Sequence, residues 1–530
     1  MNLAELLSIP AEMFPDHEVL RFEGQSTTYE ALQERVGRTA SALRALGVVP
    51  GDRIAVLQTN TPAVVEALYA SAMVGAVFVP LNFRARSDEL QHMVQVARPR
   101  LLLAGERYLE TAEGLAARDG GLQVAALDSP RVHLPHLPSL ASQAEPMRPD
   151  EAADLDDDLA VLMFTSGTTA AAKAVMLAHD DLTSFVFNTT EPADGSDRGS
   201  SLVAAPLYHI AGLTSVLASG FAGRRIVLMR QFDAAEWLEL AGTERVTHAF
   251  VVPTMLRWVL DHPRFSATDL AHLQVLSYGA APMPLSVIRR AIDAFPTAVQ
   301  FINAFGQTET TSTVTVLGPD DHRLDGTPEE VEQKLRRLGS IGRPLPDVEL
   351  SIVGESGEPV APGQVGEIAI RSARTMRGYY QETAATDAAI RDGWLHTRDL
   401  GWMDDDGYVF LVGRRSEMII RGGENIAPEE IELVLESHPA VDEAAVIGVP
   451  DDEWGERVVA IVAPSAGERV GLEELAEYCR ERLASFKKPE LIFFMDALPR
   501  NSLGKVLRSE LRSRYAGMQG IGGRDGERDE

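Results

Sequence analysis

The chain has 530 residues, enough for two to four domains at roughly 150 residues each. Apolar residues make up 45% and charged residues 24%, an ordinary globular composition that argues against a largely disordered chain. The 49 Lys and Arg against 78 Asp and Glu give a net charge of −29, which disfavours non-specific binding to nucleic acid or anionic lipid. The single cysteine, Cys479, excludes an intrachain disulfide framework and a cysteine-rich metal site.

The N-terminal sequence has no basic region before its apolar stretch, which Pro10 and Glu12 interrupt, so no signal peptide is predicted. The longest apolar run, 67–81, contains Gly75 and is shorter than the ~20 residues that span a bilayer. We therefore expect a cytoplasmic protein without an integral membrane segment.

The first 340 residues alternate between helical patterns and short apolar runs. Apolar residues recur at helical spacing from Leu32 to Leu46, and Gly47 is placed to end that helix. Thr61 and Pro62 have the residue types of an N-cap and a first helical position. Strands are predicted at 52–57, 76–81, 101–103, 123–125, 159–164, 202–204, 225–229 and 275–277. This alternation predicts an α/β fold with largely parallel sheets.

Beyond about residue 340 the predicted strands, at 348–353, 366–371 and 408–412, are separated by glycine-rich turns, which indicates an antiparallel β subdomain over about 340–412. A compact unit of strands and helices follows. The predicted architecture is a large N-terminal domain of parallel-sheet α/β subdomains plus this β subdomain, with a small mobile α+β C-terminal domain. Their bounds are 1–412 for the first, 413–417 for a hinge, 418–515 for the second and 516–530 for a disordered tail.

The most informative motif is Thr165-Ser166-Gly167-Thr168-Thr169-Ala170-Ala171-Ala172-Lys173, directly after a predicted strand. Hydroxyl and backbone N–H groups in such a loop can surround phosphate oxygens, and a lysine adds positive charge. It is not a Walker A loop, because Ala172 replaces the second glycine and Ala174 follows the lysine. The alternative is an ordinary polar loop joining a strand to a helix.

This motif resembles the phosphate-binding signature T-S-G-T-T-G-x-P-K-G of the adenylate-forming superfamily, which includes acyl-CoA synthetases, adenylation domains of peptide synthetases and luciferases. It departs from the signature at Ala170, Ala172 and Ala174, where alanine restricts the backbone more than glycine does. Further regions match the superfamily in the expected order, so the resemblance extends from about residue 20 to 515.

The resemblance implies an ATP site in the N-terminal domain. Glu309 would hold Mg²⁺ on the triphosphate, Thr308 would contact the phosphates, and Asp399 with Arg414 would bind the ribose hydroxyls. The alternatives are a solvated loop carboxylate for Glu309 and a structural salt bridge for Asp399 and Arg414. The other implied nucleotide contacts are Thr165, Ser166, Gly167, Thr168, Thr169, Lys173, Gly279, Ala280, Ala281, Asn303, Phe305 and Gly306, with Phe305 replacing the usual tyrosine.

The resemblance also implies an acyl pocket with His209 at its gate; taken alone, His209 would be interpreted as a core histidine. The pocket would be apolar, with no Lys or Arg evident for a second carboxylate, which favours a fatty or aromatic monocarboxylic acid over a dicarboxylate or an amino acid. Besides residues that also contact the nucleotide, its implied lining is Tyr208, His209, Ala211, Val252 and Thr310.

In the C-terminal domain, Lys505 matches the adenylation lysine, a cation that offsets the charge repulsion at the α-phosphate. Ser416 occupies the hinge position of the superfamily. The residues implied to bind CoA are Gly422, Gly423, Trp454, Phe486 and Lys488, the last three of which could instead be ordinary packing residues.

We therefore predict an ATP-dependent acyl-CoA ligase that uses Mg²⁺, forms acyl-AMP and passes the acyl group to CoA, releasing AMP and pyrophosphate. Three alternatives stay open: an adenylation enzyme that loads a carrier protein, a nucleotide- or acyl-binding homologue with weak catalysis, and a luciferase-like oxygenase. The expected partners are small molecules, and a homodimer is the prior for the oligomeric state. The sequence does not identify the acid or its chain length.

Overall fold

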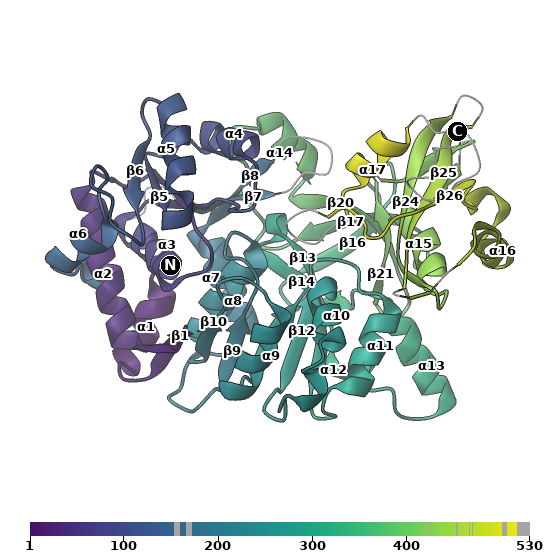
Figure 1. Ribbon diagram of the computed structural model, residues 1–530, viewed down its shortest axis with the longest axis horizontal. Helices are drawn as coiled ribbons and strands as arrows, with labels where there is room; N and C mark the ends of the chain where they lie inside the picture. The colour runs from purple at the N-terminus through teal and green to yellow at the C-terminus, as the bar shows by residue number, and fades with distance from the viewer. Residues whose placement is uncertain are drawn as a thin grey trace.

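The computed structural model describes residues 1–152, 159–165, 172–415, 417–422, 424–451, 454–465, 467–468, 470–500 and 506–516. The N-terminal part contains two large sheets and a third, smaller one, and the C-terminal unit lies at one end of the molecule in Figure 1. The predicted α/β fold class is confirmed. The predicted tail falls almost entirely outside the described residues.

The first large sheet has, within the described residues, the strand order β18-β8-β7-β4-β3-β5-β6. Its central strands are parallel, and β8 and β18 add to one edge in antiparallel pairs. The parallel strands are buried on both faces, which explains their continuous apolar sequences. The bounds are β3 (Arg53–Leu57), β4 (Val77–Pro80), β5 (Leu101–Ala104), β6 (Gln123–Ala126), β7 (Leu159–Thr165), β8 (Lys173–Ala178) and β18 (Gly378–Tyr379).

The second large sheet has the order β15-β14-β13-β12-β11-β9-β10-β1-β2 in the described part of the chain. The strands from β13 to β1 are parallel, and β2, β14 and β15 are antiparallel additions at the two edges. The bounds are β1 (Glu18–Phe22), β2 (Gln25–Thr28), β9 (Ser200–Val203), β10 (Arg225–Leu228), β11 (His248–Val251), β12 (Val275–Gly279), β13 (Gln300–Gln307), β14 (Ser312–Leu317) and β15 (Arg343–Pro344).

A helical layer lies between the two large sheets, because one core cluster contains residues of both sheets and of these helices. The helices are α1 (Glu5–Met13), α2 (Tyr29–Ala45), α3 (Pro62–Val74), α7 (His179–Thr189) and α8 (Ile210–Phe221). Separate clusters cover the outer faces. They involve α4 (Ser87–Ala97) and α5 (Leu109–Arg118) on the first sheet, and α9 (Ala234–Thr243), α10 (Pro253–Asp261) and α11 (Leu285–Ala294) on the second.

The ends of α3 show which local signals determine a helix. Gly75 ends it with φ +74, a left-handed conformation that glycine adopts without strain. Thr61 takes the N-cap position, as predicted, but its side chain makes no cap hydrogen bond. Pro62, which lacks an N–H group, leaves one donor fewer to satisfy at this end.

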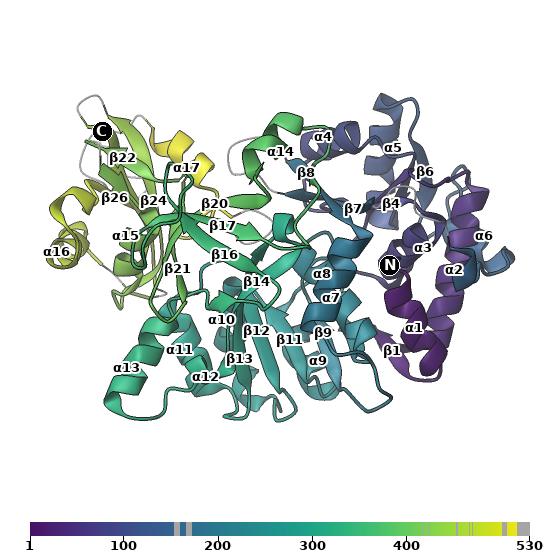
Figure 2. The ribbon, with the colours of Figure 1, turned by 180° about the vertical axis from the view of Figure 1, so that it is seen from behind.

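The third sheet is antiparallel in every pair of its described strands, which confirms the predicted β subdomain. Figure 2 shows it between the second large sheet and the C-terminal unit. Its core cluster also includes Val314 of β14, so it packs directly on the edge of that large sheet. The bounds are β16 (Glu349–Val353), β17 (Gly366–Arg371), β19 (Ile390–Arg391), β20 (Trp394–Met403) and β21 (Val409–Arg414), flanked by α12 (Pro319–His322), α13 (Pro328–Arg337) and α14 (Thr383–Ala389).

The C-terminal unit is a sheet with helices on both faces. Along β24, Ala444 and Val446 pack under α15 and α16, whereas Ala445 and Ile447 pack under α17, as the two-residue period of a strand requires. The bounds are β22 (Ile419–Arg421), β23 (Glu424–Ile426), β24 (Val441–Asp451), β25 (Gly455–Pro464), β26 (Leu491–Phe494), α15 (Pro428–Glu436), α16 (Leu472–Arg482) and α17 (Arg508–Tyr515).

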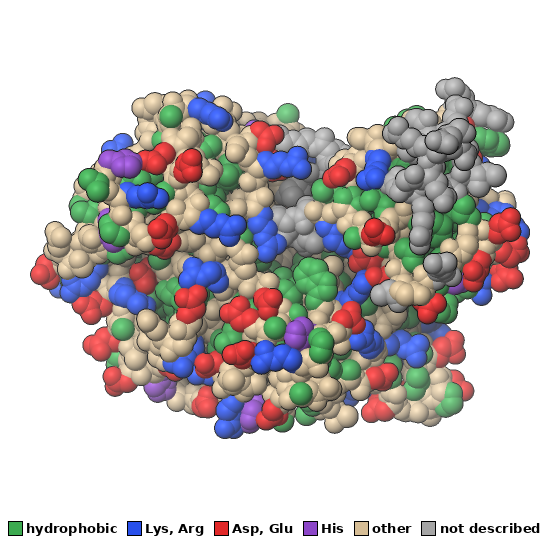
Figure 3. All heavy atoms as spheres, viewed as in Figure 1, with side chains coloured by type: hydrophobic (Ala, Val, Ile, Leu, Met, Phe, Trp, Pro, Cys, Tyr) green, Lys and Arg blue, Asp and Glu red, His purple; other side chains and the backbone are tan. Residues whose placement is uncertain are grey.

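Two further properties concern the surface and possible membrane contact. Basic and acidic side chains are interspersed over the face shown in Figure 3. Among the helices of the described residues, none combines the length and the apolar character needed to cross a bilayer.

Candidate functional site

The predicted phosphate loop connects two antiparallel strands, β7 and β8, rather than a strand and a helix. Thr165, the last residue of β7, pairs with Lys173, the first residue of β8. The pairing brings the two ends of the loop together and places Lys173 beside it. The loop residues that lie outside the described part of the chain, and whose roles stay predictions, are Ser166, Gly167, Thr168, Thr169, Ala170 and Ala171.

Lys173 is held by two residues that the sequence motifs did not identify. Its ammonium lies 4.8 Å from the centre of the Tyr379 ring and 3.8 Å from the Glu382 carboxylate. Tyr379 belongs to β18, which pairs with β8, and Glu382 immediately precedes α14. Neither Tyr379 nor Glu382 stands in a recognisable motif. Both residues come close to Lys173 only because β18 pairs with β8 in the folded sheet.

Glu309 lies in a 3₁₀ turn, Thr308–Thr310, that follows β13. Its Oε1 accepts a hydrogen bond of 3.0 Å from the Tyr379 hydroxyl, and its carbonyl accepts one of 2.9 Å from the Met376 N–H. Burial and the Glu309 charge raise the pKa of Tyr379 above its usual value, so the phenol stays protonated and acts as the donor. The side chains of Glu309, Tyr379 and Lys173 therefore form one connected group.

The turn after Glu309 has an unusual backbone. Thr311 and Ser312 have φ of +49° and +76°, a region that residues with a Cβ rarely adopt. Thr310, which was predicted in the acyl pocket, is 1% exposed. Its hydroxyl accepts from the Gln307 N–H at 2.9 Å and lies 2.8 Å from the Ser312 carbonyl oxygen. That hydroxyl thus stabilises the turn that presents Glu309.

A buried arginine, also absent from the sequence motifs, supports this turn. Arg374 is fully buried, and its Nη1 donates to the carbonyl groups of Thr310 and Thr311 at 3.2 and 3.4 Å. Its Nε donates to Asp347 at 2.6 Å, which compensates the buried charge. The strained backbone is therefore held by contacts from a different segment of the chain, as strain at functional sites generally is.

The two residues predicted at the ribose lie side by side on β20 and β21. Arg414 Nε donates to Asp399 at 2.9 Å, and Gln307 Nε2 donates to the other carboxylate oxygen at 2.6 Å. Burial alone would lower the pKa of Arg414, but the charges of Asp399, Glu417 and Glu309 outweigh it and raise that pKa. The salt bridge is present; the ribose contact stays a prediction.

The predicted nucleotide contacts between residues 279 and 306 lie on β13 or at and just after the end of β12, and these two strands are parallel neighbours. A Cβ atom at Gly279 would lie 2.1 Å from the Ala304 carbonyl oxygen, so only glycine permits this approach. Ala280 has φ +65°, a further left-handed residue. Asn303 donates to the Ser340 carbonyl at 3.2 Å. The remaining predicted contacts on this side are Ala281, Phe305 and Gly306.

The predicted acyl-pocket residues lie at the start of α8 and before α10. The ring centres of Tyr208 and His209 are 4.2 Å apart, and Tyr208 meets Phe83 edge-on at 5.0 Å. The Thr214 hydroxyl of α8 lies 3.3 Å from the Ser312 hydroxyl, in the turn after Glu309. The start of α8 is thus connected to the predicted triphosphate side. Ala211 and Val252 are half-buried.

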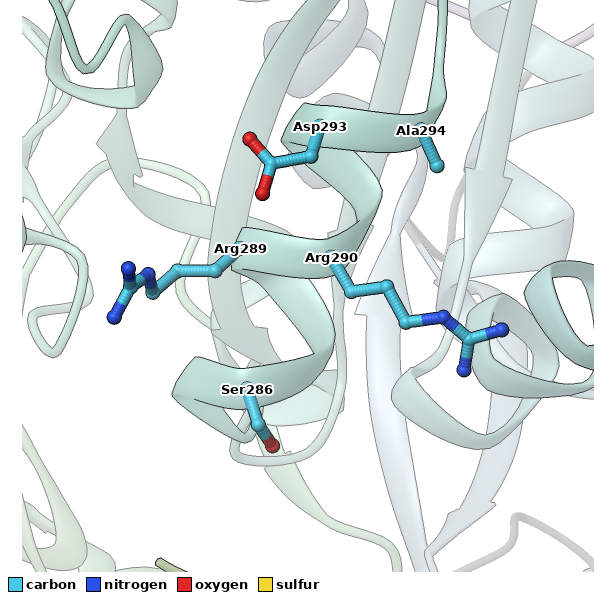
Figure 4. Close-up of a pocket in the computed structure, with 5 residues that line it drawn as sticks. All are labelled: Ser286, Arg289, Arg290, Asp293 and Ala294. Atoms are coloured by element: carbon cyan, nitrogen blue, oxygen red, sulfur yellow. The ribbon is translucent and has the colours of Figure 1, made fainter.

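One surface hollow lies elsewhere. Figure 4 shows that its lining comes from α11, with Arg289 and Arg290 pointing away from each other. None of the residues predicted for the nucleotide, the acid or CoA lines it. Its lining residues are Ser286, Arg289, Arg290, Asp293 and Ala294.

Three of the predicted CoA residues, Gly422, Trp454 and Phe486, are linked to one another on the C-terminal unit. Trp454 and Phe486 are 46% and 36% exposed. Arg421 lies 5.5 Å from the Trp454 ring centre and donates to the Phe486 carbonyl at 3.0 Å. Gly422, in the turn between β22 and β23, donates to the Trp454 carbonyl at 2.7 Å. Arg421 therefore connects the two exposed rings, and Lys488 follows the second of them in sequence.

The segments next to the predicted hinge and next to the predicted adenylation lysine share one ion cluster. Arg508, at the start of α17, lies 3.0 Å from Glu417 and 2.6 Å from Glu432. Both carboxylates are at most 12% exposed in their side chains, so the cluster is buried. Three predicted residues lie outside the described part of the chain, and their roles stay predictions: Ser416, Gly423 and Lys505.

The donor set fits a magnesium ion that arrives with the nucleotide. Within the described residues, no group of three or more His, Cys, Asp or Glu side chains is arranged to hold a metal. Nucleotide-dependent enzymes commonly bind Mg²⁺ through one or two carboxylates together with phosphate oxygens. A single Glu309, oriented by Tyr379, matches that requirement.

Comparison with known proteins extends over nearly the whole chain. A family model described as "AMP-binding enzyme" matches residues 8–380, and one described as "AMP-binding enzyme C-terminal domain" matches residues 430–505. A feruloyl-CoA synthase from Amycolatopsis sp is 39% identical over 507 residues, which are 95% of this chain and 97% of that protein. A fatty acid–[acyl-carrier-protein] ligase from Streptomyces coeruleorubidus is 34% identical over 524 residues, 97% of each chain. Among solved structures, ATP-bound MatB from Rhodopseudomonas palustris has a TM-score of 0.87 and 29% identity, with 97% of this chain and 99% of that chain covered.

Proposed function

The chain belongs to the AMP-binding enzyme family, the adenylate-forming acid–thiol ligases, and from this premise we propose that it is an ATP-dependent acyl-CoA ligase for a fatty or aromatic monocarboxylic acid. One observation carries the proposal: the triphosphate and ribose candidates converge. Tyr379 connects Glu309 to Lys173, and Gln307, at the end of β13, connects the same turn to Asp399.

In the first step a carboxylate oxygen attacks the α-phosphorus of ATP. The bond from that phosphorus to the bridging oxygen breaks, and acyl-AMP and pyrophosphate form. Lys173 and Lys505 offset the repulsion between the two approaching anions. Asp399 accepts hydrogen bonds from the ribose hydroxyls and fixes the position of the nucleotide. Mg²⁺, when bound through Glu309, neutralises charge on the triphosphate.

In the second step the C-terminal domain rotates about residues 413–417, which removes Lys505 and brings the turn at Gly422 and Gly423 to the acyl-AMP. The CoA sulfur attacks the acyl carbonyl carbon. The bond to the phosphate oxygen breaks, AMP leaves, and the thiol proton passes to solvent. Trp454 and Phe486 are exposed as a stacking surface for the CoA adenine would be.

The test is a panel of acids with ATP, Mg²⁺ and CoA. It contains benzoates, cinnamates, straight-chain fatty acids of increasing length, and malonate as a dicarboxylate. We expect at least one monocarboxylic acid to give pyrophosphate, AMP and a thioester in equal amounts, and malonate to give none. The Glu309→Gln variant, which keeps the side-chain size, is the matched control and should be inactive. Absence of acid-dependent pyrophosphate across the panel would refute the proposal.

A second candidate function is the loading of a carrier protein, which the similarity to a fatty acid–[acyl-carrier-protein] ligase favours. Both functions share the adenylation step and differ only in the thiol. Offering free CoA and a phosphopantetheinylated carrier protein separately distinguishes them. Efficient product with CoA supports the first function, whereas product with the carrier protein alone supports the second.

A further inference from the structure

The backbone of Tyr379 is held by hydrogen bonds that do not involve its side chain. In the two-residue strand β18 it pairs with Val175 of β8, two residues after Lys173. Its N–H donates to the Thr386 hydroxyl at 2.9 Å, and the next residue, Tyr380, donates to the Ala174 carbonyl at 2.8 Å. The side chain is 9% exposed, so its position is determined by the sheet edge.

The Tyr379 hydroxyl determines how the Glu309 carboxylate is rotated. It donates to Oε1 at 3.0 Å, and Met376, from the same segment, donates to the Glu309 carbonyl at 2.9 Å. Backbone and side chain of Glu309 are therefore both held by residues 376–379. A hydrogen bond to one oxygen of a carboxylate leaves the other with a defined direction, which matters for a metal ligand.

The ring of the same tyrosine positions Lys173. The ammonium lies 4.8 Å from the ring centre, within the ~6 Å over which a cation is attracted to an aromatic face. Glu382 lies 3.8 Å from the same ammonium and is 43% exposed in its side chain, so this ion pair is weak and can be exchanged for a phosphate group. The ring continues to attract the ammonium during that exchange.

We propose that Tyr379 is a positioning residue for the triphosphate, which orients the metal-binding carboxylate of Glu309 through its hydroxyl and the ammonium of Lys173 through its ring. This rests on the proposed function for the identity of the nucleotide. One side chain then couples the 3₁₀ turn that carries Glu309 to the strand that carries Lys173, so that metal binding and phosphate binding depend on the same residue.

The first test separates the hydroxyl from the ring. Tyr379→Phe removes only the hydroxyl, and Tyr380→Phe makes the same chemical change one residue away. Binding of Mn²⁺ to the enzyme–ATP complex is followed by electron paramagnetic resonance, with AMP affinity and melting temperature as structural readouts. We expect Tyr379→Phe to weaken Mn²⁺ binding roughly tenfold, as loss of a hydrogen bond to a metal ligand does, with AMP affinity, melting temperature and the Tyr380→Phe control unchanged.

The second test concerns the ring. Tyr379→Leu should weaken MgATP binding several-fold beyond Tyr379→Phe, and this extra loss should vanish in a Lys173→Met background, because the ring then has no cation to hold. Wild-type Mn²⁺ binding in Tyr379→Phe, an equal loss of AMP affinity, or an extra loss that persists without Lys173 would each overturn the proposal. Failure of the acid panel with these binding changes intact would instead refute the proposed function alone.

Discussion

Asp399 accepts hydrogen bonds from two protein donors at once, Arg414 on the neighbouring strand and Gln307 at the end of β13. It is 6% exposed, so these donors compensate the cost of burying its charge. Gln307 also begins the turn that presents Glu309. At the scale of single residues, the predicted ribose site and the predicted metal site are therefore joined through one residue, Gln307.

The variant Asp399→Asn tests this arrangement. An asparagine amide would face at least one of the two donors with its own NH₂ group, so we expect the KM for ATP to rise roughly tenfold while the KM for the acid stays near wild type. The free energy of unfolding should fall by about 1–3 kcal/mol. Steady-state kinetics and chemical denaturation measure the two effects.

The matched control is Asp321→Asn, since Asp321 is also paired with an arginine, Arg337, at 3.2 Å and accepts from the Tyr408 hydroxyl at 2.9 Å. It belongs to α12 and has no predicted nucleotide contact, so it should lose stability with no change in the KM for ATP. An unchanged KM in Asp399→Asn would contradict the ribose assignment.

Sequence motifs identify residue types at the site but not the contacts between them. Glu309, Asp399 and Lys173 stand in recognisable motifs, whereas the side chains that hold them, Tyr379 and Gln307, were missed as supporting partners. Tyr379 meets Glu309 from another segment of the chain, and such a pairing leaves no trace in local sequence. The left-handed backbone of Thr311 and Ser312 was missed for the same reason, because the arginine that supports it, Arg374, lies far away in the sequence.

At the scale of elements, α15 carries carboxylates on its buried side. Glu436 accepts from the Ala444 N–H at 3.2 Å, and burial raises its pKa to about 8 against the small opposing effect of that hydrogen bond. Burial also raises the pKa of Glu429 to about 7, although the charge of Arg508 opposes the change. The C-terminal unit therefore holds acidic groups that favour their protonated form when folded.

Stability of the C-terminal unit should consequently depend on pH. A carboxyl group whose pKa is higher in the folded state contributes stability in its protonated form below about pH 4.5, and loses it as the pH rises toward about 8. Glu436→Gln cannot ionise, so we expect it to be roughly 1–3 kcal/mol more stable than wild type above pH 8 and nearly equal at pH 5. Denaturation of the full chain across this range is the measurement. Glu473→Gln makes the same chemical change at an exposed position of α16 and serves as the matched control. A pH-independent stability difference for Glu436→Gln would contradict the expected linkage.

Helices and strands were predicted correctly where the sequence pattern that indicates them is local. The strand predicted at 159–164 is β7 (Leu159–Thr165), and the helix predicted from Leu32 to Leu46 is α2 (Tyr29–Ala45). The segment after β7 was expected to lead from a strand to a helix in one interpretation, yet it leads to β8. A short apolar run such as Lys173–Ala178 fits a buried strand and a buried helix segment equally well. The two-residue strand β18 is too short to show any periodicity.

At the scale of the whole molecule, the two parts meet through weak ion pairs and a tight backbone contact. Arg257 of α10 pairs with Asp442 and, at 3.1 Å, with Glu443 of the C-terminal unit. These side chains are 20–33% exposed, and ion pairs that solvent can reach typically contribute only about 0–1 kcal/mol each. At the predicted hinge, Gly413 has φ +149°, a conformation that residues with a side chain rarely adopt, and the Glu429 carboxylate packs against it.

We propose, above all, that a single site shared by both parts first forms acyl-AMP and then transfers the acyl group to a thiol. The most direct measurement compares the two half-reactions in the Lys505→Ala variant. Acid-dependent pyrophosphate release should fall roughly 100-fold or more, because the cation at the α-phosphate is lost, while thioester formation from supplied acyl-AMP should stay close to wild type. An equal loss in both half-reactions would contradict the claim.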